Sequence, residues 1–221
     1  MTITICAYDD QRKAFGVAIT SSSLAVAGRC VKLDGELGAV SSQNYTNPLL
    51  KWHLLEELSI GASAAQAVSV AIKKDPNADY RQLFAVDSSG GVGAFTGKKN
   101  LPYANHAEAD GVVAGGNLLV TSDIPEQMIK AFNRDSNQPI EKRLLTALLR
   151  AKQAGGEKGT LVSAALFVCD GAKWPTTDLR IDNSQNPLED LAAILELWMH
   201  EKQDYLDRAL DPARAADFIV E

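Results

Sequence analysis

The chain has 221 residues, 46% of them hydrophobic and 23% charged, as expected for one globular domain over residues 1–221. Its formal net charge is −6 and its lysines and arginines are scattered, which excludes the clustered positive charge that a nucleic-acid partner requires. The N-terminus carries no basic and apolar leader, and no apolar run reaches the roughly 20 residues that cross a bilayer, so we expect no membrane partner and a cytoplasmic location.

Strand signals dominate the first 44 residues. Residues 2–8 alternate β-branched side chains, and residues 14–20 resume the pattern after a polar break, so both ranges are predicted strands. A third apolar stretch covers residues 24–27, and a fourth, residues 37–40, ends in Ser41-Ser42-Gln43-Asn44. The functional hypothesis is built around this opening part of the chain.

Two helices and a hairpin are expected next. Pro48 suits the first turn of a helix that runs to Leu58, and Ser63 is a typical N-cap for a second helix over residues 64–73. Residues 83–87 and 92–96 predict the strands of a hairpin, because the connection between them is rich in glycine.

The second half of the chain mixes single strands with long helices. A short strand over residues 111–114 leads into Gly115-Gly116-Asn117. The remaining predicted elements are a helix capped by Ser122, a helix over residues 140–154, a central strand over residues 161–169, an edge strand over residues 179–182 and a terminal helix from Pro187 to about Leu206. Strands thus come in blocks rather than alternating with helices, which favours an α+β fold of antiparallel sheets with helices packed outside them.

The cysteines and histidines do not form a recognisable metal motif. Cys6, Cys30 and Cys169 are odd in number and lie in apolar contexts, which indicates buried thiols rather than disulfides or metal ligands. The three histidines are dispersed along the chain. We therefore expect no metal and no cofactor.

Thr2 is the sharpest functional candidate. Removal of Met1 is favoured before a small residue and would give Thr2 a free α-amine. Such an amine has a pKa of about 7.7–8.0, so part of it is neutral near pH 7 and can accept the proton of the hydroxyl on the same residue. Thr2 would then be nucleophile and base at once. The alternative is that Thr2 is only the second residue of an ordinary strand.

Polar residues at strand ends are candidates for binding a substrate. Ser21, Ser42 and Gln43 follow predicted strands, where hydroxyl, amide and backbone N–H groups can line a cleft. Serine is equally suited to ordinary turns, and this reading stays open.

Three further residues are candidates on chemical grounds. Asn117 follows paired glycines, which let a backbone approach a ligand closely, and it can donate to a developing oxyanion. Arg81 can bind a carboxylate through its forked donors, although a solvated arginine is the commoner outcome. Thr96 is a candidate because it ends a predicted strand and, like Asn117, lies next to a glycine.

Several stretches resemble a known family in their order along the chain. They are TITICAYDD, GVAITSSSLAVAG, GAVSSQNYTNP, NADYRQLFAVD, FTGKK, GGNLL, RLLTALLRAKQAGGEKG and SAALFV. Together they are similar to the bacterial family called domain of unknown function 1028, whose members resemble N-terminal-nucleophile hydrolases. The resemblance extends from Thr2 to about Trp198. It implies a four-layer αββα sandwich of two antiparallel sheets, amide hydrolysis as the default chemistry, and Thr2 at the nucleophile position.

The resemblance has one marked departure. Family members commonly follow the glycine pair with an aspartate, a basic residue and a glutamine. This chain has the run from Glu157 to Val162 there, so basic and amide groups of the loop are lost. If the loop binds substrate in relatives, this protein binds something else or nothing.

We therefore predict an N-terminal-nucleophile amidohydrolase that acts on a small amide and forms a homo-oligomer. Thr2 Oγ1 would attack the carbonyl, Asn117 and backbone N–H groups near Gln43 would hold the oxyanion, and Ser21, Gln43 or Arg81 would orient the substrate. Two alternatives stay open. One is a catalytically silent protein that binds a small ligand in the same cleft. The other is a structural oligomer subunit in which the helix of Trp198 packs against a partner.

Overall fold

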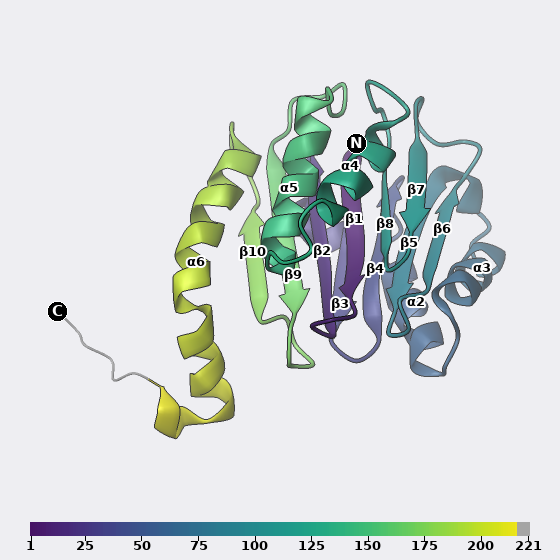
Figure 1. The fold of residues 1–221 in the computed structure, drawn as a ribbon. Helices are drawn as coiled ribbons and strands as arrows, with labels where there is room; N and C mark the ends of the chain where they lie inside the picture. Colours follow the sequence, from purple (N-terminus) through teal and green to yellow (C-terminus); the bar gives the residue numbers. More distant parts are fainter. Residues whose placement is uncertain (216–221) are drawn as a thin grey trace.

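The chain folds into two antiparallel sheets and six helices within residues 1–215, the part that the computed structural model describes (Figure 1). Across the first sheet lie, in order, β10 (Thr177–Ile181), β9 (Ser163–Cys169), β2 (Ala14–Ser21), β1 (Thr2–Asp9), β8 (Val112–Gly116) and β7 (Asn105–Ala109). Across the second lie β3 (Val31–Asp34), β4 (Gly38–Asn44), β5 (Arg81–Asp87) and β6 (Val92–Thr96). The helices are α1 (Val26–Cys30), α2 (Leu49–Ser59), α3 (Ala64–Lys74), α4 (Ile124–Asn133), α5 (Ile140–Gln153) and α6 (Pro187–Leu210).

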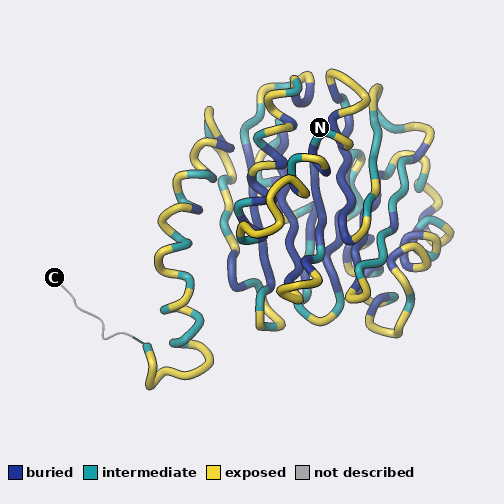
Figure 2. The backbone as a smooth tube through the Cα atoms, viewed as in Figure 1, coloured by how far each residue is buried: buried dark blue, intermediate teal, exposed yellow. Residues whose placement is uncertain are grey.

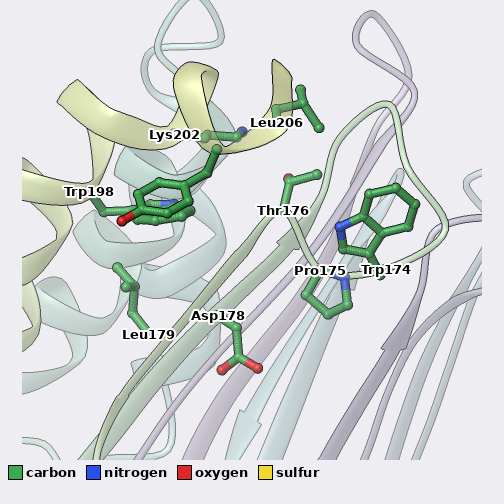
Figure 3. A pocket seen from close by; sticks show the side chains of 9 residues that line it. Trp174, Pro175, Thr176, Asp178, Leu179, Trp198, Lys202 and Leu206 are labelled. Carbon is green, nitrogen blue, oxygen red and sulfur yellow. The ribbon is translucent and has the colours of Figure 1, made fainter. Parts of the chain in front are cut away.

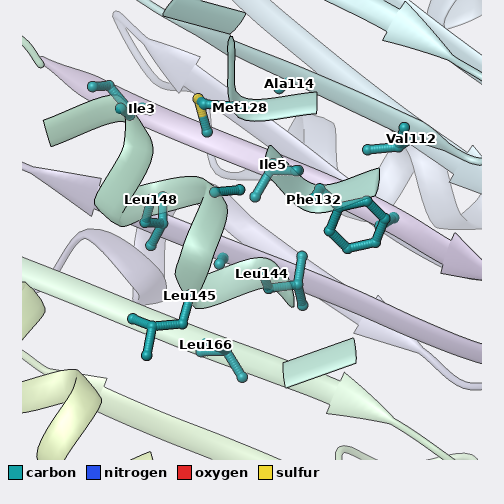
Figure 4. Packing of buried hydrophobic residues seen from close by; sticks show 14 of the residues in the cluster. Ile3, Ile5, Val112, Ala114, Met128, Phe132, Leu144, Leu145, Leu148 and Leu166 are labelled. Carbon is teal, nitrogen blue, oxygen red and sulfur yellow. The ribbon is translucent and has the colours of Figure 1, made fainter. Parts of the chain in front are cut away.

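Alternating side chains of the first sheet contribute to two separate cores. On β1, Ile5 belongs to a buried cluster that includes Leu144 of α5 and side chains of α4 (Figure 4). Cys6, the next residue, belongs to a second cluster, in which Phe15 of β2 and Phe84 of β5 meet from different sheets. Because successive strand residues point to opposite faces, one face of the sheet packs against helices and the other against the second sheet.

Helices α2 and α3 cover the outer face of the second sheet. Leu54 of α2 and Ala67 of α3 are buried in a third cluster with Leu83 of β5. The predicted cap of α3 is confirmed: Ser63 Oγ accepts a hydrogen bond from the Gln66 N–H, and Gln66 Oε1 accepts one from the Ser63 N–H, at 3.3 and 2.9 Å. This reciprocal pair satisfies two N–H groups that the first turn leaves free.

Helix α6 packs beside the outer strand β10 and continues past the sheet (Figure 1). Trp198 donates its indole N–H to Thr177 Oγ1 at 3.0 Å and stacks on the ring of Tyr205. The Trp198 side chain is therefore engaged within its own chain, and packing of its helix against a partner stays a prediction. The last turns of α6 are exposed or half-buried (Figure 2).

Most predicted elements are confirmed within a few residues, and the differences have local causes. Strands β3 and β7 were missed because they are short and mostly polar, and the apolar stretch before β3 leads into the short helix α1. Asp123, not Ser122, is the N-cap residue of α4. The strand predicted as central, β9, lies next to the edge strand β10, while β2 and β1 occupy the middle of the sheet.

The described helices, including the 24-residue α6, lack the combination of length and apolar character that crossing a membrane would require.

Candidate active site

Thr2 opens β1 with its side chain directed into the space between the two sheets. Ile3 and Ile5 pack on the helix side of the first sheet, so Thr2 and Thr4, which alternate with them, face the second sheet. Only 4% of the Thr2 surface is exposed. A substrate therefore reaches this hydroxyl only if Met1 or the chain above it moves.

Three hydroxyl residues stand side by side at this end of the first sheet. Thr2 pairs with Ser21 on β2, and Ser21 pairs with Ser163 on β9. Thr2 Oγ1 lies 3.4 Å from Ser21 Oγ, which also donates to the carbonyl of Met1. Ser163 Oγ donates to the Ser23 carbonyl at 2.6 Å. With Met1 attached, the hydroxyl of Thr2 and the carbonyl of Met1 thus both adjoin Ser21 Oγ.

A chain of buried amides connects Thr4, two residues after Thr2 on β1, with the second sheet. Thr4 Oγ1 donates to Gln43 Oε1 at 2.5 Å, and Gln43 Nε2 donates to Gln82 Oε1 at 2.9 Å. The same Gln82 oxygen accepts from Asn117 Nδ2 at 3.1 Å. Gln82 Nε2 lies within hydrogen-bond distance of Thr96 Oγ1, at 3.1 Å. Three side chains, those of Gln43, Asn117 and Thr96, are thereby fixed around one buried glutamine, and Thr4 is linked to it through Gln43.

His106 extends this amide chain to β7. Its Nδ1 lies 2.8 Å from Thr96 Oγ1, and its ring packs beside Phe84. Neither His106 nor Gln82 was predicted as a site residue, because their partners come from other strands and only the folded sheets bring them together. A glutamine at the start of an otherwise apolar strand was the available sequence signal for Gln82.

Asn117 is anchored beside the start of β1. Its N–H donates to the Thr2 carbonyl at 3.1 Å, while its side-chain oxygen is buried and has no hydrogen-bond partner within residues 1–215. The glycine pair before it permits close packing within the protein. A Cβ on Gly115 would come within 2.3 Å of the Phe84 ring, and one on Gly116 within 3.0 Å of the Thr2 carbonyl oxygen.

Unsatisfied polar atoms gather around the same strand ends. Ser22 Oγ, Asn117 Oδ1 and Glu157 Oε2 are buried and lack a hydrogen-bond partner among the described residues. Ser41 Oγ shares this property and lies on the face of β4 that carries Gln43. Buried polar groups are normally paired, so free hydrogen-bonding capacity at several neighbouring positions is typical of a place that receives a ligand or water.

Glu157 is an acidic residue that contacts Ser22, the residue after Ser21 of the hydroxyl row. It is 6% exposed, and its Oε1 accepts a hydrogen bond from the Ser22 N–H at 2.8 Å. Burial raises the pKa of this carboxyl, although the hydrogen bonding of Ser22 and the charge of the N-terminal amine act in the opposite direction.

Two predicted site residues, Ser42 and Arg81, lie apart from this arrangement. Ser42 Oγ donates to the Asn47 carbonyl at 3.1 Å. Arg81 Nε forms a hydrogen-bonded ion pair with Asp75 at 2.8 Å, and its guanidinium also donates to the Tyr45 carbonyl. The structure therefore brings together Thr2, Ser21, Gln43, Thr96 and Asn117, but neither of these two side chains.

A separate cavity lies beneath α6. It has a volume of about 200 Å³ and is lined from α6 by Trp198 and Lys202 and from the β9–β10 connection by Trp174 (Figure 3). None of its lining residues belongs to the hydroxyl row or to the amide chain. It is therefore distinct from the candidate site at Thr2.

Comparison with known proteins identifies the family. The family model described as "Family of unknown function (DUF1028)" matches residues 2–191. A solved structure of a DUF1028 protein from Silicibacter pomeroyi is 30% identical, covers 90% of this chain and 89% of its own, and has a TM-score of 0.83. Anbu (ancestral beta-subunit) structures from Yersinia bercovieri and Hyphomicrobium sp. strain MC1 align over 100% of both chains at 12% and 13% identity, each with a TM-score of 0.40. No protein with a curated description matches the chain.

Proposed function

The chain belongs to DUF1028, a family of unknown function, and we propose that it is an amidohydrolase of the N-terminal-nucleophile type that cleaves a small amide. In this proposal the mature chain begins at Thr2, whose hydroxyl is the nucleophile and whose α-amine is the base. The single observation that carries it is the position of Thr2 Oγ1, beside Ser21 and within a buried polar space between the sheets.

The proposed reaction has two balanced steps. Thr2 Oγ1 forms a bond with the amide carbonyl carbon while its proton passes to the α-amine, and the protonated amine then donates that proton to the leaving nitrogen as the C–N bond breaks. Water next attacks the resulting ester, which releases the carboxylic acid and restores the hydroxyl. An N–H donor is needed where negative charge develops on the carbonyl oxygen. We assign that role to Asn117, together with backbone N–H groups near Gln43.

Substrate-binding roles follow from which side chains share the inter-sheet space. We assign them to Ser21, Gln43 and Thr96, and we leave out Arg81 and the Ser42 side chain because their hydrogen bonds, to Asp75 and to the Asn47 carbonyl, lie outside this arrangement. The buried glutamine network would keep these groups in one arrangement, as a preorganised site requires.

We also propose that the two sheets and their helices form the four-layer αββα sandwich of N-terminal-nucleophile hydrolases. In support, one buried cluster lies between the sheets, a second between the first sheet and α4–α5, and a third between the second sheet and α2–α3. The small-molecule substrate, the homo-oligomer and the cytoplasmic location stay predictions.

Intact-mass measurement followed by substitution of Thr2 tests the proposed chemistry. The purified protein should lack the mass of Met1, and a panel of small amides should include one from which it releases an amine. Thr2→Ala should abolish that release, whereas Thr2→Ser, which keeps a hydroxyl, should retain part of it. Thermal stability should barely change in either variant, because the Thr2 hydroxyl makes only a long contact of 3.4 Å with Ser21.

Three outcomes would count against this assignment. A retained Met1 removes the amine from the mechanism, and full turnover by Thr2→Ala moves the chemistry to another residue. Ligand-induced stabilisation by an amide that is never cleaved would favour the binding-protein alternative.

A further inference from the structure

The connection between α5 and β9 closes over the beginning of β1. In the first sheet β1 lies between β2 and β8. The connection reaches the end of β2 through the Val162 N–H, which donates to the Ser21 carbonyl at 2.9 Å. It reaches the chain after β8 through a bridge between Glu157 and Leu119 and through the Lys158 N–H, which donates to Leu118. It therefore spans the two neighbours of β1 at the end where the chain begins (Figure 1).

Glu157 belongs to this connection, and only one of its two carboxylate oxygens accepts a hydrogen bond from a described residue. Oε1 accepts the Ser22 N–H, whereas Oε2 is buried and has no partner among the described residues. An unpaired buried carboxylate oxygen is unfavourable, so a donor is expected to complete it. The neighbouring cation does not serve: the Lys158 ammonium lies over the ring of Tyr103, 4.5 Å from its centroid. Hydrogen bonding of Ser22 and the positive charge of the N-terminal amine, which here belongs to Met1, both act to lower the pKa of the Glu157 carboxyl against the effect of burial.

We propose that Glu157 is a positioning residue that binds the α-amine of Thr2 through Oε2 once Met1 has been removed. This inference rests on the proposed function, in which that amine is the base. Thr2 is linked to the same region, since its carbonyl accepts the Asn117 N–H and Asn117 lies two residues before Leu119, which forms a bridge with Glu157.

The pairing would give the site the three groups that an activated nucleophile uses: a hydroxyl, a base beside it and a third group that orients the base. When the amine takes the hydroxyl proton it becomes an ammonium, and a carboxylate in contact with it stabilises that charge. The same contact favours the protonated amine before reaction, so it should also lower the fraction of neutral amine at a given pH. The lower fraction of neutral amine can be measured without a substrate.

The test compares the reactivity of the N-terminal amine in the full-length protein and in Glu157→Gln. Gln keeps an oxygen that can accept the Ser22 N–H but cannot hold an ammonium by charge. Acetylation of the α-amine by acetic anhydride at pH 6.5, followed by mass spectrometry of the N-terminal peptide, should be about tenfold faster in Glu157→Gln, which corresponds to one unit of pKa. Glu157→Asp, which keeps the charge, should restore slow acetylation in part.

Glu189→Gln is the matched control. Glu189 lines the same surface cavity as Glu157 but is paired with Lys152 and half exposed, so its neutralisation should leave the acetylation rate unchanged. An NMR titration of Thr2 should show its midpoint at lower pH in Glu157→Gln. A residue that only holds the loop in place would not move that midpoint.

The possible failures are distinguishable. Equal acetylation of the wild type and Glu157→Gln, with Met1 absent, overturns the role of Glu157 and leaves the Thr2 nucleophile standing. If Met1 is retained, the proposed function fails. In that case the same comparison shows whether Glu157 binds the α-amine of Met1. Faster acetylation of that amine in Glu157→Gln would restrict the inference to Met1, and equal acetylation in both proteins would overturn it.

Discussion

Gln82 is the residue that joins most of the polar groups of the candidate site. It is fully buried, its Oε1 accepts from Gln43 and Asn117, and its Nε2 faces the Thr96 hydroxyl and two backbone carbonyls, of Asn105 and Gly116, at 2.9–3.1 Å. Three strands of the second sheet, β4, β5 and β6, and the ends of β7 and β8 in the first sheet are thus joined by one side chain. Buried networks of this kind are specific when complete and unfavourable when broken.

Replacing Gln82 by leucine should destabilise the protein by about 2–4 kcal/mol, because the donors and acceptors that it satisfies would stay buried and unpaired. The free energy of unfolding from urea titrations monitored by circular dichroism measures this loss. Gln153→Leu, at an exposed position of α5, provides the control and should change stability by less than about 0.5 kcal/mol. Equal stability of Gln82→Leu and wild type would mean that the network is dispensable.

At the residue scale, the sequence indicated which strand ends carry polar side chains but not which face of the strand each of them occupies. Thr2 was selected as the residue after Met1, Gln43 and Thr96 as residues at the ends of predicted strands, and Asn117 as the residue after a glycine pair. The folded sheets bring these four residues to one region. Arg81 and Ser42 are each one residue away from a member of the network, Gln82 or Gln43. Since adjacent strand residues point to opposite faces, this single step places them on the other side of the sheet.

At the scale of elements, a buried ion pair fixes the turn between β1 and β2 against two helices. Arg143 of α5 donates to Asp9 Oδ2 at 2.9 Å and to the Phe132 carbonyl at the end of α4 at 3.1 Å. Asp9 also accepts two backbone N–H groups of the turn, from Gln11 and Arg12. Both charged side chains of the pair are at most 10% exposed.

Asp9→Ala should therefore lower the free energy of unfolding by about 3 kcal/mol, since it leaves the Arg143 guanidinium buried without its carboxylate. The adjacent Asp10→Ala is a matched control. Asp10 pairs with Lys13, but both side chains are at least 70% exposed, so no measurable change is expected. Thermal unfolding of the two variants side by side provides the comparison. Similar losses of stability in both would show that the Asp9–Arg143 pair contributes no more than the exposed Asp10–Lys13 pair.

The long elements were predictable because each carries its own periodic pattern. The leucine stripes of α5 and α6 and the alternation of β1 and β2 indicate both type and extent. β7, with the sequence NHAEA, carries no such pattern and exists because β8 and the side chains of α4 lie beside it. The order of strands in the sheet also could not be read from the sequence, since pairing of β2 with β9 joins segments about 140 residues apart.

At the scale of the whole molecule, the first and last parts of the chain share one sheet. β1 and β2 lie between β9 and β8, so residues near the N-terminus occupy the middle of a sheet completed by much later strands. The inter-sheet cluster then joins this sheet to the one built from residues 31–96. This arrangement supports one cooperative domain, which the length of the chain predicts and unfolding experiments can test.

Substituting one leucine in each outer cluster tests that cooperativity. Leu144 on α5 packs against Gly16 of β2, where a Cβ would come within 2.4 Å of it, and Leu54 on α2 is fully buried on the opposite side of the molecule. Leu144→Ala and Leu54→Ala should each cost about 2–5 kcal/mol. If the chain is one domain, calorimetry of either variant should show a single transition at lower temperature, with equal calorimetric and van't Hoff enthalpies. Leu197→Ala, at an exposed site on α6, should leave that temperature nearly unchanged. A second transition in Leu54→Ala that keeps the wild-type temperature would instead mean that the two sheets unfold independently, and the inter-sheet cluster would then be too weak to couple them.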